Sequence, residues 1–112
     1  ITVSLFIDPD KKQIDASEKT GARVIELHTG RYADAKDEKQ QGRYFKELKN
    51  AVSYAGKKGM VVNAGHGLNY YNAARVAGIK GIEELNIGYS IICRAILIGL
   101  ERAVAEMKVL IR

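Results

Sequence analysis

The chain has 112 residues, with 18 Lys and Arg against 13 Asp and Glu, which gives a formal net charge of +5. A content of 46% hydrophobic and 28% charged residues is typical of one globular domain and excludes disordered and collagen-like chains. One cysteine, Cys93, and two histidines exclude an internal disulfide and the usual four-ligand zinc site. The longest apolar run, residues 91–100, is too short to cross a bilayer. We therefore expect a cytoplasmic protein with no metal and no membrane contact.

The basic residues are spread among acidic ones. Lysines in the segments 36–39, 46–49 and 57–58 lie near Asp and Glu, which is the pattern of a solvated helix face. We therefore expect no nucleic-acid partner, although a modest positive field can gather small anionic substrates.

Strand and helix patterns alternate along the chain. Strands are predicted at residues 3–7, 24–28, 60–64 and 84–87, and helices at residues 10–19, 37–57 and 69–77. A fourth helix begins near Tyr89 or Ser90 and is expected to run unbroken to the C-terminus, with Cys93 packed in the core. This alternation predicts a parallel sheet in a single α/β region, residues 1–112. Because the chain opens directly on a strand pattern, we expect it to be part of a longer polypeptide.

Four strand–helix units leave two architectures open, an open doubly wound sheet or half of an eight-unit barrel. Glu26 and His28 share one face of their strand, and Asn63 and Asn86 lie similarly within the third and fourth strands. An open sheet covered by helices is usually apolar on both faces, whereas a barrel interior becomes polar near its mouth. The polar residues therefore favour the barrel.

A glycine-rich segment, residues 63–69, follows the third strand. His66 lies there between Gly65 and Gly67, at the strand end where parallel folds place catalysis. The alternative is a tight turn with a solvent-exposed histidine. One unit later, Gly88 precedes a helix start whose free amides can hold a phosphate, although a lone glycine can also simply turn the chain.

Glu26 is a carboxylate within an apolar strand. A buried charge must be paired, protonated or in contact with water, so Glu26 belongs either to a structural ion pair or to a site. His28 and Thr29 follow it and can reach the mouth of a site, whereas the sequence does not decide whether Arg94 faces a ligand or water.

Three segments together resemble the pyridoxine 5'-phosphate synthase family, and the likeness extends over essentially the whole chain. These segments are Glu26-Leu27-His28-Thr29-Gly30-Arg31-Tyr32-Ala33, Asn63-Ala64-Gly65-His66-Gly67-Leu68 and Glu84-Leu85-Asn86-Ile87-Gly88. The resemblance implies a (β/α)8 TIM barrel, of which this chain is a (βα)4 half-barrel corresponding to strands 5–8, with the N-terminal half absent. It also implies assembly as a homo-oligomer.

The resemblance further implies condensation of 3-amino-2-oxopropyl phosphate with 1-deoxy-D-xylulose 5-phosphate into pyridoxine 5'-phosphate and phosphate, without a cofactor. By position, His66 resembles the proton donor and acceptor, and Glu26 the carboxylate that stabilises charged intermediates. Gly67, Gly88 and Tyr89 match positions that hold the substrate phosphate, although the family has His where this chain has Tyr89. Two alternatives stay open: another sugar-phosphate barrel enzyme, which would be expected to carry a strand-end Schiff-base lysine that the four strands lack, and a non-catalytic phosphate-binding half-barrel module.

Overall fold

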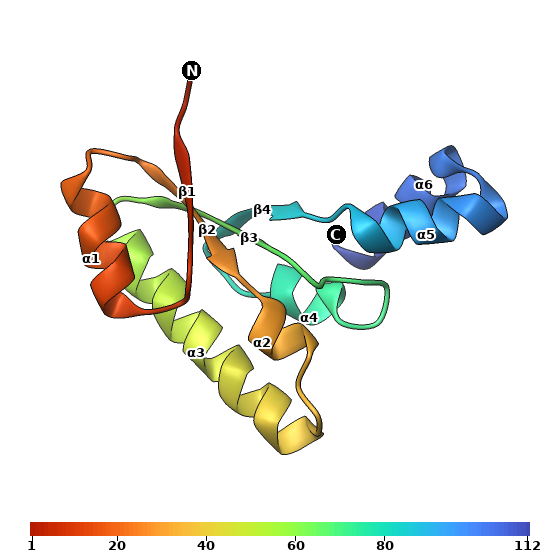
Figure 1. Cartoon of the computed structure of the whole chain (residues 1–112), viewed down its shortest axis with the longest axis horizontal. Helices are drawn as coiled ribbons and strands as arrows, with labels where there is room; N and C mark the ends of the chain where they lie inside the picture. Colours follow the sequence, from red (N-terminus) through yellow and green to blue (C-terminus); the bar gives the residue numbers. More distant parts are fainter.

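The computed structural model describes residues 1–112 as an α/β fold on one parallel sheet (Figure 1). Its four strands are β1 (Ser4–Ile7), β2 (Val24–His28), β3 (Val61–Gly65) and β4 (Ile82–Asn86). They pair in the order β1-β2-β3-β4, each parallel to its neighbours. A doubly wound sheet reverses its strand order at a switch point, and this sheet has no reversal. The sheet is therefore singly wound. This strand order differs from that of a doubly wound sheet and agrees with the half-barrel, the other architecture that the sequence left open.

Six helices accompany the sheet. They are α1 (Lys11–Lys19), α2 (Gly30–Ala33), α3 (Glu38–Lys57), α4 (Ala73–Ala77), α5 (Tyr89–Ile98) and α6 (Leu100–Leu110). Figure 1 shows α1 and α3 gathered beside the strands, whereas α5 and α6 lie together at the other end of the molecule. No helix combines the length and the apolar character needed to span a membrane.

Two of the helices begin at an aspartate that caps them locally. The Asp10 side chain accepts a hydrogen bond from the Gln13 amide at 3.1 Å, and Asp37 accepts one from the Gln40 amide at 2.7 Å. Each carboxylate satisfies an amide that the first helical turn leaves free. The predicted starts of α1 and α3 are confirmed to within a residue.

The hydrophobic core lies between one face of the sheet and α1, α3 and α4. In β2 the residues Ile25 and Leu27 are buried, whereas Glu26 and His28 are only half-buried on the opposite face. This alternation is the one predicted for β2. The core is completed by buried side chains from β3 and the helices: Val62, Ala64, Ile14, Leu48, Val52 and Val76.

The helix α4 is shorter than the helix predicted over residues 69–77. The first turn of that prediction is wrong. The Asn69 side chain accepts hydrogen bonds from the amides of Tyr71 and Asn72, and the Asn72 side chain accepts one from the Asn69 amide. Asparagine side chains that bind nearby amides hold the backbone in a turn. The helix α4 therefore begins only at Ala73.

The prediction of one unbroken C-terminal helix is also wrong. Gly99 has φ 85° and ψ 151°, which ends α5 and starts α6 in a new direction. The two helices are joined by a hydrogen-bonded ion pair of 3.0 Å between Arg94 Nε and Glu106 Oε2. Cys93 is exposed rather than packed in the core, because α5 buries none of its residues.

Candidate active site

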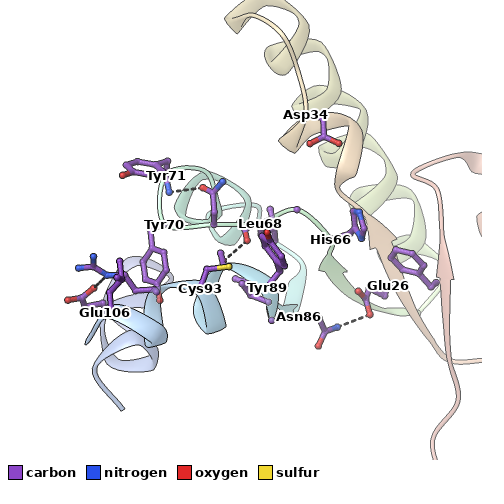
Figure 2. Close-up of a pocket in the computed structure, with 18 residues that line it drawn as sticks. Glu26, Asp34, His66, Leu68, Tyr70, Tyr71, Asn86, Tyr89, Cys93 and Glu106 are labelled. Atoms are coloured by element: carbon purple, nitrogen blue, oxygen red, sulfur yellow. Dashed lines mark hydrogen bonds and ion pairs between the residues drawn. The ribbon is translucent and has the colours of Figure 1, made fainter. Parts of the chain in front are cut away.

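The five residues to which the family resemblance assigns site roles line one cavity of about 1120 Å³. These residues are Glu26, His66, Gly67, Gly88 and Tyr89. Figure 2 shows Glu26 and His66 on the sheet side of the cavity, with Tyr89 on the side of α5. The cavity begins at the carboxyl ends of β2, β3 and β4, which is where parallel α/β folds bind ligands. The structure therefore brings together residues that are up to 63 positions apart in the chain, Glu26 and Tyr89.

Glu26 is held by a neutral partner and not by an ion pair. Its Oε2 accepts a hydrogen bond of 2.8 Å from Asn86 Nδ2, across the intervening strand β3. The carboxylate passes over Gly65, where a Cβ would overlap Oε1 and would lie only 3.0 Å from the Asn86 carbonyl. Glycine at position 65 therefore leaves the space that the carboxylate occupies, and the ion-pair alternative from the sequence is not found.

His66 is exposed and stands at the end of β3 in a cluster of three rings. Its imidazole lies 4.6 Å from that of His28 between ring centroids, at an interplanar angle of 27°. Phe6 from β1 packs against both rings in a tilted orientation, with centroids 4.9 Å from His28 and 6.5 Å from His66. The Nδ1 of His28 accepts a hydrogen bond of 3.1 Å from the Gly30 amide, which fixes the orientation of that ring. The imidazole of His28 thus forms a fixed surface against which the imidazole of His66 stacks.

The opposite wall of the cavity is the N-terminus of α5. No side chain caps this helix, so its first amides, beginning at Tyr89, keep their hydrogen-bonding capacity. The Ser90 hydroxyl donates a hydrogen bond of 2.9 Å to the Leu68 carbonyl and so ties the helix start to the loop after β3. Free amides and the helix dipole both favour an anion at this position. Tyr89, at this helix start, is 88% exposed.

Charged groups at the far end of the cavity are paired with one another. Arg94 donates to Glu106, and this hydrogen bond holds the pKa of the Glu106 carboxyl below its ordinary value. The same contact raises the pKa of the Arg94 guanidinium. The Arg94 guanidinium is therefore engaged in the ion pair that joins α5 to α6. Nowhere in the chain do three or more His, Cys, Asp or Glu side chains converge to hold a metal ion.

Phe6 is a lining residue that the sequence did not single out. The available signal was the alternation in β1, which places Phe6 on the same face of its strand as Ser4 and, by register, beside Glu26. Thr29, which was expected to be able to reach the mouth, is instead fully buried.

These features define a parallel α/β protein with an acidic and an imidazole side chain facing an open helix N-terminus at the carboxyl ends of its strands. The sequence model of the family described as "Pyridoxal phosphate biosynthesis protein PdxJ" matches residues 1–112. The chain belongs to this family. The resemblance inferred from three motifs is thereby confirmed.

Curated relatives agree with the family. Proteins named pyridoxine 5'-phosphate synthase from Geotalea uraniireducens and Pelobacter propionicus are 54% and 55% identical over 112 residues, which are 100% of this chain and 47% of each relative. The protein of the same name from Coxiella burnetii is 55% identical over 111 residues, 99% of this chain and 46% of that protein. The chain spans about half the length of the curated relatives it matches.

Proposed function

We propose that this chain is the C-terminal half of a cytoplasmic pyridoxine 5'-phosphate synthase and supplies strands five to eight of its (β/α)8 barrel. The singly wound strand order supports this, because a barrel adds each strand beside the previous one. The polar face of β2 also supports it, since Glu26 and His28 would then face the interior of the barrel near its mouth. The relatives have room for four further units, because the chain covers 47% of their length.

The proposed reaction joins 3-amino-2-oxopropyl phosphate to 1-deoxy-D-xylulose 5-phosphate. The amine and the ketone condense to an imine with loss of water, and later steps release inorganic phosphate and close the pyridine ring with loss of a second water. Each step moves protons, and an exposed histidine can act as donor and as acceptor near neutral pH. His66 performs these transfers in our proposal. The Glu26 carboxylate stabilises the positive charge that develops on the imine nitrogen.

The phosphate of the amino-ketone substrate binds between the two glycine-flanked strand ends. The amides of Gly67, Gly88 and Tyr89 are its proposed donors, supported by the uncapped start of α5 across the cavity from His66. A contact through the Tyr89 amide tolerates tyrosine in place of the family's histidine, since the side chain stays in solvent.

The proposal rests above all on one observation, the meeting of Glu26 and His66 in one cavity of a chain that belongs to this family along its whole length. The test is the synthase assay on the full-length protein with His66→Ala and with Glu26→Gln. Loss of the proton-transfer group should lower kcat by about 10²- to 10⁴-fold. Glu101→Gln, on the exposed surface of α6, is the matched control and should keep full activity. Unchanged turnover in H66A and E26Q would contradict the catalytic roles proposed for His66 and Glu26, whereas a wild-type protein without turnover would indicate a phosphate-binding module.

We also propose that the missing N-terminal half and further copies of the protein are its partners. Phe6 on β1 is 54% exposed, and Ile96 and Leu97 on α5 are 80% and 79% exposed. Apolar side chains left in water favour association. Residues 1–112 alone should therefore self-associate in sedimentation experiments and show no synthase activity until the N-terminal half is added. A fully active monomer would contradict this division of the barrel.

A further inference from the structure

His66 has an unusual backbone conformation. Its φ of 84° makes it the one residue other than glycine with a positive φ in the chain. For an L-residue this left-handed region costs about 1–2 kcal/mol, and such a conformation persists only where the surroundings enforce it. The surroundings of His66 should therefore contain a group that holds its peptide units in place.

Thr29 is that group. Its hydroxyl oxygen lies 2.7 Å from the Gly65 carbonyl oxygen and 2.5 Å from the His66 carbonyl oxygen, so its single proton is shared between them, and its amide donates a separate hydrogen bond of 2.8 Å to the Gly65 carbonyl. The two carbonyls flank the His66 amide and α-carbon, so Thr29 fixes the peptide units on both sides of the residue. These contacts join positions 36 and 37 residues apart.

We infer that Thr29 is a positioning residue that holds His66 in its left-handed conformation and thereby aims the imidazole into the cavity. Thr29 has an exposed fraction of 0%, so it touches neither solvent nor a bound substrate. With a negative φ at position 66 the Cα–Cβ bond would point elsewhere, and the ring would leave its stack on His28. The inference rests on the proposed role of His66 in proton transfer.

The loop downstream of His66 is held by a different residue. Asn72 Nδ2 donates a hydrogen bond of 3.2 Å to the Gly67 carbonyl. Loss of the Thr29 hydroxyl therefore leaves the loop attached on the Asn72 side while it frees the His66 carbonyl. The expected result is a local change of backbone conformation at His66 in a protein that stays folded.

The test compares two substitutions in the full-length synthase. Thr29→Val keeps the shape of the side chain but removes the hydroxyl, and Thr29→Ser keeps the hydroxyl. A displacement of a reacting group by about 1 Å can cost about 10²-fold, so we expect T29V to lower kcat by about that factor and T29S to retain most of the activity. Thr20→Val is the matched control, because the Thr20 hydroxyl also binds a carbonyl, that of Ser17 at 2.7 Å, but at the exposed end of α1.

A second comparison separates positioning from general stabilisation. In a His66→Ala background, T29V should cause no further loss of kcat, because the group that it aims is absent. An equal loss in both backgrounds, or a folded T29S with the low kcat expected of T29V, would overturn the inference. If T29V does not fold, the T29S result still decides.

A crystal structure of T29V provides a readout that does not depend on catalysis. We expect a negative φ at His66 and an imidazole displaced from His28, and an unchanged backbone there would overturn the inference. If H66A keeps full activity while T29V alters this backbone, the proposed function fails and the positioning role stands.

Discussion

Gly67 offers a sharp test of how tightly the loop after β3 is placed. Its φ is 75°, and a Cβ at this position would lie 2.7 Å from the Cβ of Ala33 at the end of α2. Ordinary contact begins at 3.4 Å, so the loop of a Gly67→Ala variant and Ala33 must separate by about 0.7 Å to reach it. We expect the left-handed φ alone to cost about 1–2 kcal/mol of unfolding free energy. The shift displaces His66 and the Gly67 amide, and should lower kcat by up to about 10²-fold.

The two contributions to the G67A defect can be separated with a second substitution. Ala33→Gly removes the opposing Cβ, so the double variant A33G/G67A should recover much of the lost kcat while it keeps the conformational cost at position 67. Urea unfolding and the synthase assay on wild type, both single variants and the double variant provide the cycle. A G67A protein with unchanged stability and turnover would refute the reasoning. Failure of A33G to restore any activity would refute the proposed steric cause.

Three further outcomes are expected. The His66→Gly variant should be more stable to urea than the His66→Ala variant by about 1 kcal/mol. Both substitutions remove the ring, but the positive φ at position 66 is disfavoured for alanine and allowed for glycine. Equal stabilities would mean that this φ is not strained. Gly42→Ala in α3, where a Cβ meets nothing within 4 Å, should raise the unfolding free energy by about 0.5–1 kcal/mol and leave the activity unchanged. The pKa of Glu106 is lowered from 4.5 by its hydrogen bond to Arg94. The stabilisation from this carboxylate is therefore present above pH 4.5 and lost as the pH falls through the lowered pKa, so thermal unfolding of Glu106→Gln should show a weaker decline in acid than wild type.

The parts of the fold that could be predicted are those fixed by neighbouring residues. Asp10 and Asp37 cap helices through amides three residues away, so both helix starts are visible in the sequence. The break at Gly99 was missed because the apolar spacing continues on both sides of it and a glycine within a helical pattern is often tolerated. The start of α4 was missed because the side chains of Asn69 and Asn72 bind nearby backbone amides and hold the segment before Ala73 in a turn.

The candidate site also contains residues that could be predicted from the sequence and residues that could not. Glu26 and His66 could be placed together in advance, because one follows from the period of two in its strand and the other from the position of a strand end. The supporting residues could not be identified, because their contacts depend on how the strands are aligned. Asn86 reaches Glu26 across 60 positions of sequence, and the Thr29 hydroxyl reaches the His66 carbonyl across 37. No local pattern records the alignment of β2, β3 and β4.

The strand order also bears on how this chain folds during synthesis. Each strand pairs with the strand made immediately before it, as Ser4 does with Val24 and Val24 with Val61. Every pairing therefore closes a loop of a few tens of residues, and loops of that size have a modest entropic cost. A growing chain can add β2, β3 and β4 in turn as each leaves the ribosome, without rearranging the sheet already formed. The cavity is completed last, since its far wall, the N-terminus of α5, follows β4 in the chain.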